Sequence, residues 1–264
     1  MRQYPYQDIH ELSGRIEVRG ILGSAVNELG LRIAGGVWPV GEVISREADL
    51  VEDLRVSRSV VREAVRIISA KGMLRSRTSD GTRVQQRSKW RLLDPDVMEW
   101  CIQAGDRKSL LSDLLQLRLV LEPGVARTAT ELATEEQRAE VERAWQAKVA
   151  VFKDADLPSD LRRHEFIKTD LDFHRSLIAC VSSELLDQLF GVIEAALGLL
   201  LDLQMRARGY TSEMIGMGES HELHEAVFDA FAARDPNRAE AAMRKLIQRA
   251  IDDAIAGFRL LEKD

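Results

Sequence analysis

The stretch Val56-Ser57-Arg58-Ser59-Val60-Val61-Arg62-Glu63-Ala64 decides the fold of the first part of the chain. It opens with serines, which cap helices, and continues with apolar residues three or four positions apart. The pattern predicts an amphipathic helix that begins at Ser57 and ends at Lys71-Gly72. Arg58 and Arg62 are four residues apart and therefore lie on one face of this helix.

The residues on either side of this helix predict the rest of a small domain. Residues 19–34 have apolar side chains at helical spacing and precede Gly35-Gly36, and residues 45–54 predict a second, shorter helix. Residues 73–84 alternate around Ser79-Asp80-Gly81, which is typical of a β-hairpin with a tight turn. Helix, turn and helix followed by a two-stranded wing form a winged helix-turn-helix, so this part is predicted to bind DNA.

The distribution of charge supports this prediction. The whole chain of 264 residues has 37 Lys and Arg against 43 Asp and Glu, a net charge of −6. Residues 1–90 have 15 basic against 11 acidic residues, a net charge of +4, whereas residues 91–264 have 22 against 32, a net charge of −10. Residues 55–87 alone have nine basic and two acidic residues. A basic first domain beside an acidic second one is expected when only the first approaches phosphates.

The predicted DNA contacts follow from the way such a motif docks. The N-terminal residues of its second helix meet base edges in the major groove, and arginine binds guanine O6 and N7 through two hydrogen bonds. Serines at the helix N-terminus and basic residues of the wing suit phosphates. A single surface arginine is often only solvated, so the prediction depends on the whole set: Ser57, Arg58, Ser59, Arg62, Arg66, Arg75, Arg77, Gly81, Thr82 and Arg83.

Residues 91–264 show one amphipathic helical pattern after another and no strand-like alternation. Helices joined by short turns form a bundle. The chain is therefore predicted to be mainly α, with a winged helix-turn-helix domain that has a small β-hairpin wing at residues 1–90 and an all-α helical bundle at residues 91–264. The predicted helices of the bundle cover residues 97–104, 110–132, 134–155, 159–180, 183–208, 219–233 and 237–261.

Polar residues on apolar helix faces mark a candidate site in the bundle, because a buried charge is costly unless it is paired or bound. Arg118 lies among leucines four residues before Glu122, which indicates either an inward ion pair or an arginine that binds an anion. Asp170 and His174 share a helix face, and His224 begins a separate apolar run. These three residues could ligate a metal, or the carboxylate could simply orient a core histidine. Spacing alone leaves both alternatives open.

Residues 56–64, together with Gly72 and residues 80–84, closely resemble the winged helix-turn-helix of the GntR family of bacterial transcriptional regulators. The resemblance implies binding to operator DNA. The family pattern usually places a DNA-contacting arginine two residues before the leucine of the short second helix, where this chain has Ala48 before Leu50. Arg46 is the expected substitute for that contact.

The bundle is similar to the FCD-type ligand-binding domain of the FadR subfamily, which senses small metabolites, often carboxylates and sometimes through a divalent metal. The functional residues of that domain fall here on Arg118, Asp170, His174 and His224. Its fourth metal ligand falls on Leu246, and leucine cannot ligate a metal. No cofactor is therefore certain. Zn, Ni or Mn held by Asp170, His174 and His224 is one expectation, and direct hydrogen bonds from these residues to the effector are preferred.

Residues 90–100 and 122–127 are similar in particular to regulators of sugar-acid catabolism. This resemblance implies an effector with one carboxylate and several hydroxyls, such as an aldonate. Arg118 would bind the carboxylate, while Asp170 and the two histidines would bind hydroxyls. Arg208 or Tyr210 would close the site.

These features predict a homodimeric, cytoplasmic repressor that binds a palindromic operator and is released from it by a small carboxylate. Cys101 and Cys180 form no metal or disulfide motif, and no signal or membrane-spanning segment is expected. A metal-dependent hydrolase that uses Asp170, His174 and His224 is the competing class, although the sequence has no obvious nucleophile motif. A nonspecific DNA-associated protein is a third alternative, which the acidic bundle disfavours.

Overall fold

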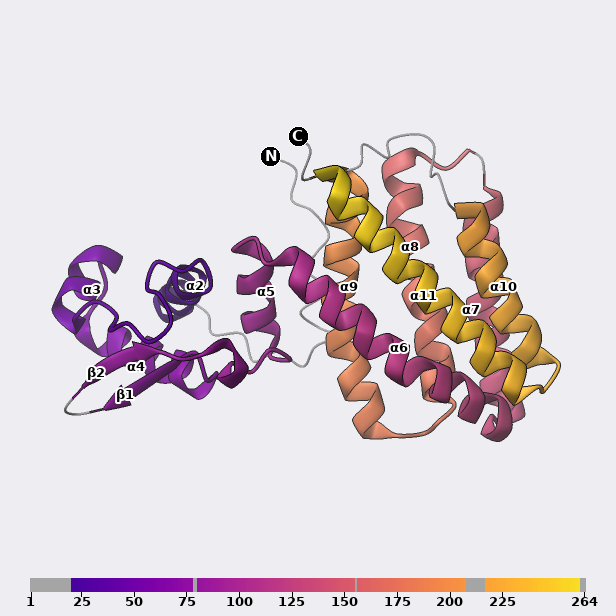
Figure 1. Ribbon diagram of the computed structural model, residues 1–264, viewed down its shortest axis with the longest axis horizontal. Coiled ribbons are helices and arrows are strands. Elements are labelled where there is room, and N and C mark those ends of the chain that lie inside the picture. Colours follow the sequence, from indigo (N-terminus) through magenta and orange to yellow (C-terminus); the bar gives the residue numbers. More distant parts are fainter. Residues whose placement is uncertain (1–19, 78–79, 155, 208–216, 262–264) are drawn as a thin grey trace. The chain divides into compact units, whose positions relative to one another are not determined.

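The computed structural model describes residues 20–77, 80–154, 156–207 and 217–261, and the chain divides into two compact units, Met1–Arg107 and Lys108–Asp264. Figure 1 shows that the first unit contains the small sheet and that the second is built from long helices. Within the described residues, no helix is both long enough and apolar enough to cross a membrane.

Up to the end of the hairpin, the first unit has the order of elements that the sequence predicts. The two strands pair antiparallel, with Leu74 opposite Val84 and Arg77 opposite Gly81. Leu74 and Val84 are buried, so this end of the hairpin contacts the core, and the other end is the exposed tip of the wing. The elements are α2 Gly20–Ala34, α3 Glu47–Leu54, α4 Arg58–Ala70, β1 Leu74–Arg77, β2 Gly81–Val84, the 3-10 helix η1 Arg87–Lys89 and α5 Pro95–Gln103.

A close contact between α2 and α5 completes the core of the first unit. A Cβ atom at Gly30 of α2 would lie 2.3 Å from the ring of Trp100 on α5, so only glycine allows this approach. The indole Nε1 of Trp100 donates a hydrogen bond to Oδ1 of Asn27, also on α2, over 2.7 Å. Trp100 is buried in the same core as Val61 and Ile68 of α4.

The boundary between the two units lies after α5, at Arg107. The sequence predicted it at residue 90, where the wing ends, and assigned the helix at residues 97–104 to the bundle, whereas this helix, α5, belongs to the first unit. The reason is that α5 contributes Trp100 and Cys101 to the core of the first unit. In addition, Nζ of Lys71, at the end of α4, lies 2.7 Å from Asp94 and 2.8 Å from Asp96, at the start of α5. The charge distribution does not report apolar packing of this kind.

The second unit is an all-helical bundle, as predicted. Helix α7 packs against α8 and α10, α8 packs against α9, and α10 packs against α11. Pro123 lies inside α6 without ending it. The helices are α6 Arg107–Leu132, α7 Glu135–Lys153, α8 Ser159–Ala179, α9 Glu184–Ala207, α10 Met217–Ala232 and α11 Pro236–Leu261.

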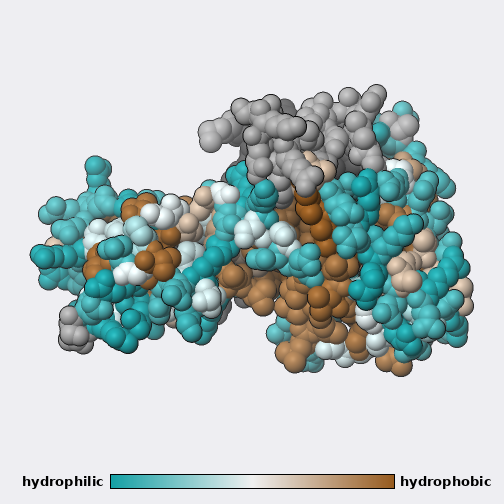
Figure 2. Space-filling view, in the orientation of Figure 1, coloured by the Kyte–Doolittle hydropathy of each residue, from teal (hydrophilic) through white to brown (hydrophobic). Residues whose placement is uncertain are grey.

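Some hydrophobic side chains of the bundle are exposed rather than buried. Val120 on α6 is 75% exposed and Leu185 on α9 is 79% exposed, and Leu132 at the end of α6 is also exposed. Figure 2 shows hydrophobic residues gathered on the visible face of the bundle, in the region of α6 and α9. Gathered hydrophobic residues on a surface are typical of a site of protein association.

Candidate functional site

The first candidate site is the N-terminal end of α4. The helix begins at Arg58, and the side-chain oxygen of Ser57 caps it by accepting a hydrogen bond from the backbone N–H of Val60. The hydroxyls of Ser57 and Ser59 lie 2.9 Å apart, so one donates to the other. Ser57 thus starts the helix. Phosphate contacts by Ser57 and Ser59 stay predictions.

Arg58 and Arg62 are both exposed on α4, four residues apart, as the spacing predicted. Nε of Arg62 lies 3.6 Å from Oε1 of Glu47 at the start of α3. An exposed ion pair of this length is weak, so DNA could displace it. Arg46 is exposed as well, and its backbone N–H donates to Asp49 as α3 begins. That contact does not use the guanidinium of Arg46.

Arg66 and Arg83 already have acidic partners in the first unit. Nε and Nη2 of Arg66 donate to the two oxygens of Glu63 over 2.9 and 2.6 Å. Nε and Nη2 of Arg83 donate to Asp80 over 2.9 and 2.6 Å, and its Nη1 donates to the carbonyl oxygen of Gly41. Either arginine must share or break these bonds to contact DNA, so they are weaker candidates than Arg58 and Arg62.

The wing presents the other predicted DNA contacts. Arg75 and Arg77 are exposed on β1. On β2, the hydroxyl of Thr82 lies 2.9 Å from that of Ser76, across the ladder. Gly81, at the tip, has a φ of 74°, a backbone conformation that favours glycine. The wing is therefore a short basic ribbon whose shape depends on Gly81.

The second candidate site is a buried group of six side chains that we call the polar cluster. It joins four helices of the bundle, α6, α7, α8 and α10. Except for Asp170, which is 13% exposed, each of these side chains is no more than 5% exposed. The polar cluster consists of Arg118, Glu122, Lys148, Asp170, His174 and His224.

Arg118 and Glu122 form the inward ion pair, one of the two alternatives that the sequence left open. Nε and Nη2 of Arg118 donate to the two oxygens of Glu122. Oε2 of Glu122 also lies 2.7 Å from Nδ1 of His174 on α8. Burial alone would raise the pKa of Glu122, but the charge of Arg118 and the contact with His174 outweigh it and lower this pKa to about 2. Glu122 is therefore ionised at neutral pH and connects α6 to α8.

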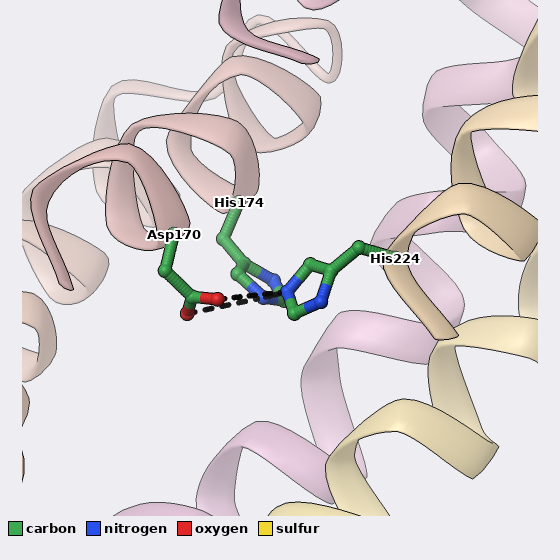
Figure 3. Close-up of side chains that lie close together, drawn as sticks. All are labelled: Asp170, His174 and His224. Atoms are coloured by element: carbon green, nitrogen blue, oxygen red, sulfur yellow. Dashed lines mark hydrogen bonds and ion pairs between the residues drawn. The ribbon is translucent and has the colours of Figure 1, made fainter. Parts of the chain in front are cut away.

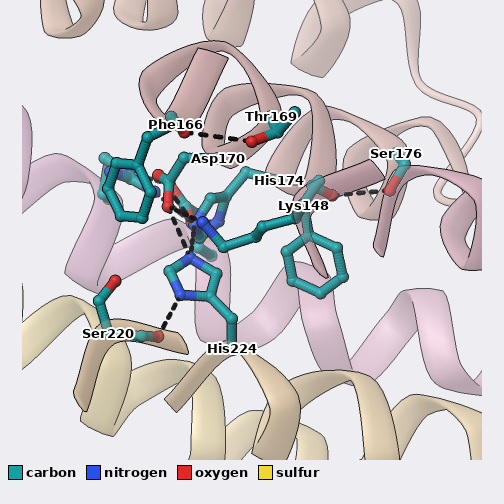
Figure 4. A network of polar contacts seen from close by, with 11 residues as sticks. Lys148, Phe166, Thr169, Asp170, His174, Ser176, Ser220 and His224 are labelled. Atoms are coloured by element: carbon teal, nitrogen blue, oxygen red, sulfur yellow. Dashed lines mark hydrogen bonds and ion pairs between the residues drawn. The ribbon is translucent and has the colours of Figure 1, made fainter. Parts of the chain in front are cut away.

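Asp170 and His174 lie on one face of α8, and His224 reaches them from α10 (Figure 3). Oδ1 of Asp170 is 2.9 Å from Nε2 of His224, and the two histidine Nε2 atoms are 3.3 Å apart. Nζ of Lys148, from α7, lies 2.7 Å from the same Oδ1 atom (Figure 4). Burial would raise the pKa of Asp170, but Lys148 and His224 hold it well below its usual range.

Each histidine of the polar cluster presents Nε2 to Asp170 because its Nδ1 is engaged elsewhere. Nδ1 of His224 lies 2.7 Å from the carbonyl oxygen of Ser220, which can only accept, so Nδ1 carries the proton. Nδ1 of His174 lies 2.7 Å from Oε2 of Glu122, so this nitrogen also points away from Asp170. The Nε2 atoms of the two histidines and a carboxylate therefore converge, as they do in metal sites whose histidines are oriented through their other nitrogen.

The donors fit a metal ion only in part. In a tetrahedral zinc site with bonds of about 2.1 Å, the ligand atoms lie about 3.4 Å apart. Nε2 of His224 lies 2.9 Å from Oδ1 of Asp170 and 3.3 Å from Nε2 of His174, which lies 3.9 Å from the other oxygen of Asp170, Oδ2. One ligand atom from each of the three residues falls within 4.8 Å of the others. The described residues add no fourth His, Cys, Asp or Glu to this group. Leu246 is a buried leucine, and a second cation, Lys148, already holds Asp170. The residues present therefore do not fit a resident divalent ion.

We expect His224 to make the protein less stable as the pH falls below neutral. Burial, and then the charge of Lys148, lower the pKa of His224 from 6.5 to about 4, although Asp170 acts in the opposite direction; His174 also faces it and lowers it further. The unfolded chain therefore takes up this proton first, and stability is lost as the pH falls from 6.5 towards 4. Each pH unit in this window costs about 1.4 kcal/mol.

Urea denaturation of the wild type and of His224→Gln measures this effect. The difference between their free energies of unfolding should change by about 2 kcal/mol between pH 6.5 and about pH 5, because glutamine does not titrate. His164 is an exposed histidine on the same helix as Asp170, so His164→Gln is the matched control. The stability of this variant should change with pH as that of the wild type does. A difference that stays constant with pH would show that His224 is not held neutral by its surroundings.

Lys148 is the member of the polar cluster that sequence reasoning missed. The buried residues of α7 are Val141, Trp145 and Lys148, spaced four and three residues apart. The sequence therefore has a lysine on an apolar helix face. A charged residue on an apolar face is the same signal that identified Arg118. Arg208 and Tyr210, which were predicted to close the site, lie outside the described residues.

Two family models match the chain, and they correspond to the two candidate sites. The model of bacterial regulatory proteins of the gntR family matches residues 23–84, which include α4 and the wing. The model of the FCD domain matches residues 113–249, which include the whole polar cluster.

The chain is also similar to individual proteins over most of its length. The galactonate operon transcriptional repressor of Escherichia coli is 29% identical over 219 residues, which are 83% of this chain and 90% of that protein. The HTH-type transcriptional repressor NanR of Cronobacter sakazakii is 30% identical over 210 residues, 77% of this chain and 74% of that protein. A solved structure, Streptococcus agalactiae GntR, is 25% identical with a TM-score of 0.48 and covers 88% of this chain and 99% of its own.

The matched families and relatives are regulators of transcription and not enzymes, so the alternative of a metal-dependent hydrolase is set aside. The matched regions also agree with the mainly α fold and the small wing of the structure. The chain belongs to the GntR family of bacterial transcriptional regulators and carries an FCD domain in its helical bundle.

Proposed function

We propose that this chain is a sequence-specific transcriptional repressor whose affinity for its operator falls when a small carboxylate metabolite binds at the polar cluster. The observation that carries the proposal is the buried polar cluster, which lies in the FCD domain of a chain whose other unit is a basic winged helix-turn-helix. Burying this many charges is costly for a bundle that serves only as a scaffold. A role in binding a ligand explains why the charges are there.

A sugar acid, such as an aldonate, is the class of effector that we propose. The Escherichia coli relative is named for the galactonate operon, and galactonate is a sugar acid. In this chain, Glu122 takes Nε and Nη2 of Arg118, so an effector carboxylate would approach the Nη1 side. Asp170 and the two histidines would bind hydroxyls. Arg208 and Tyr210 are proposed to close the site.

The charges of the polar cluster suggest how a ligand could change the bundle. Arg118 is paired with Glu122 and Lys148 with Asp170, so these four groups are balanced before any ligand arrives. A carboxylate must compete with Glu122 or Asp170 for one of the two cations. Lys148 of α7 contacts Asp170 of α8, and Glu122 of α6 contacts His174 of α8. Ligand binding at either pair would therefore alter contacts between helices, which is the kind of change that a regulator can transmit.

A homodimer on a palindromic operator is part of the proposal. One winged helix-turn-helix reads too few bases for a specific site, and paired half-sites about one helical turn apart are read by dimers. The exposed Val120, Leu132 and Leu185 supply hydrophobic surface for association of two bundles.

DNA binding and effector response can be tested together by fluorescence anisotropy at fixed salt. An operator selected from random DNA should bind two chains and should bind at least about 1,000-fold more tightly than its scrambled sequence. Sugar acids should weaken operator binding more than simple hydroxy acids or dicarboxylates do. Equal affinity for operator and scrambled DNA would instead indicate a nonspecific DNA-associated protein.

Variants of two histidines separate the two halves of the proposal. His224→Gln should keep its operator affinity and lose its response to the sugar acid, because it changes the polar cluster and not the DNA-binding unit. His164→Gln, exposed on α8, should keep both properties. If no carboxylate changes operator affinity in the wild type, the effector assignment is wrong and the assignment as a DNA-binding regulator is unaffected.

A further inference from the structure

The carboxylate among the converging donors of the polar cluster is negatively charged, and the chain itself supplies a cation beside it. Asp170, His174 and His224 point acceptor atoms towards one another, and the ammonium of Lys148 contacts Asp170 (Figure 4). We propose that the Lys148 ammonium takes the place of a divalent metal ion, so that this regulator holds the cation of its site on its own chain. The inference concerns the occupant of the site and does not depend on which effector the regulator senses.

The position of Lys148 prevents a metal ion from using Asp170 freely. Nζ lies 2.7 Å from Oδ1 of Asp170, the same oxygen that lies 2.9 Å from Nε2 of His224. A metal ion bound between the carboxylate and this histidine would have to compete with the ammonium for that oxygen. The side chain of Lys148 is only 1% exposed, so the ammonium cannot simply turn out into solvent.

A second contact holds the ammonium in place. Nζ of Lys148 lies 4.5 Å from the centroid of the Phe166 ring, on the same helix as Asp170, within the range of a cation–π interaction. Lys148 is therefore fixed between a carboxylate and an aromatic ring. Such a contact stabilises a cation in a buried environment, where water cannot solvate it.

The balance of charge also opposes a divalent ion. The single negative charge of Asp170 is already matched by Lys148, and that of Glu122 is matched by Arg118. A metal ion would add two positive charges beside a buried ammonium, and within the described part of the chain no further carboxylate joins the three donors to offset them. Three donors, a lysine and the buried Leu246 therefore make a site for an ammonium and not for a metal ion.

Metal analysis of the purified full-length wild type is the first test. The protein is dialysed against EDTA and then against metal-free buffer, incubated with Zn²⁺, Ni²⁺ or Mn²⁺, and freed of excess metal by gel filtration. We expect far less than one ion per chain to remain bound. We also expect no change in melting temperature on adding EDTA or any of the three metals. One tightly held ion per chain in the wild type would overturn the proposal.

Two substitutions should convert the site into a metal site. Leu246→His alone adds a donor at the position that the family resemblance assigns to the fourth ligand, but it keeps the ammonium, so it should bind metal poorly. Lys148→Met together with Leu246→His should take up one ion per chain and gain about 5 °C or more in melting temperature with saturating Zn²⁺ or Ni²⁺. Lys153→Met with Leu246→His, which removes an exposed lysine of the same helix, is the matched control and should behave like Leu246→His.

The outcomes distinguish the roles of the two residues. If Leu246→His binds metal as tightly as the double variant, Lys148 does not exclude the ion and the proposal is wrong. A folded Lys148→Met, Leu246→His protein that takes up no metal also contradicts it. If that double variant does not fold, the wild type and Leu246→His still decide the question. None of these measurements uses DNA or an effector. Failure of the proposal about Lys148 would therefore leave the proposed repressor function unaffected, and failure of the repressor function would leave the proposal about Lys148 unaffected.

Discussion

Replacing Arg118 with alanine should lower the free energy of unfolding by about 3–5 kcal/mol. The substitution leaves Glu122, 2% exposed, without the guanidinium that holds both of its oxygens. Burial then raises the pKa of Glu122, because the charge of Arg118 is the largest influence that lowers it. Urea denaturation at pH 7, followed by circular dichroism, measures the loss.

Two further variants show that the cost comes from the unpaired buried charge. Arg127→Ala removes another arginine of α6, but one that is 42% exposed, and it should change stability by no more than about 1 kcal/mol. Arg118→Met with Glu122→Gln removes both charges and keeps an amide oxygen that can accept from His174. This double variant should regain most of the lost stability. A double variant as unstable as Arg118→Ala would mean that the arginine acts through packing alone.

The stability cost also changes how Arg118 can be tested as an effector-binding residue. Because Glu122 depends on it, loss of effector response in Arg118→Ala would combine a missing contact with a weakened bundle. His224→Gln is the cleaner probe of the effector site. The amide group of glutamine can donate to Asp170, and the carboxylate also keeps its contact with Lys148, so it is not left without a partner.

The local features of the fold could be predicted from the sequence, and the long-range ones could not. The start of α4 follows from the cap at Ser57, and the shared face of Asp170 and His174 follows from helical spacing. The place of α5 depends on Trp100 packing against Gly30, seventy residues earlier, which no local pattern reports.

The same distinction applies to the polar cluster. His224 meets Asp170 because α10 packs against α7, which in turn packs against α8. Spacing along one helix could not pair the two residues, and only the family resemblance did. Lys148 could have been found, since it continues the buried face of Val141 and Trp145. Its partner, however, lies on another helix, and identifying it required the structure.

Replacing Arg58 with alanine should abolish specific operator binding while leaving weak binding to any DNA. Arg58 is the first residue of α4 and is exposed at the end that such motifs place against base edges. A bidentate contact between arginine and guanine contributes about 1–3 kcal/mol of discrimination. The proposed dimer presents Arg58 twice, so we expect a loss of about 2–6 kcal/mol, roughly 30-fold to 20,000-fold in operator affinity.

The comparison with Arg66 decides whether Arg58 reads bases. Arg66 lies on the same helix, two turns further on, and is held by both oxygens of Glu63, so Arg66→Ala should weaken operator binding only slightly. If Arg58 contacts bases, its loss should affect the operator and not scrambled DNA, and the salt dependence of binding should barely change. If Arg58 contacts phosphates instead, affinity for both DNAs should fall together and the salt slope should decrease by about one. The structure favours the first outcome because Arg58 leads the helix, whereas the phosphate-suited serines and wing residues flank it.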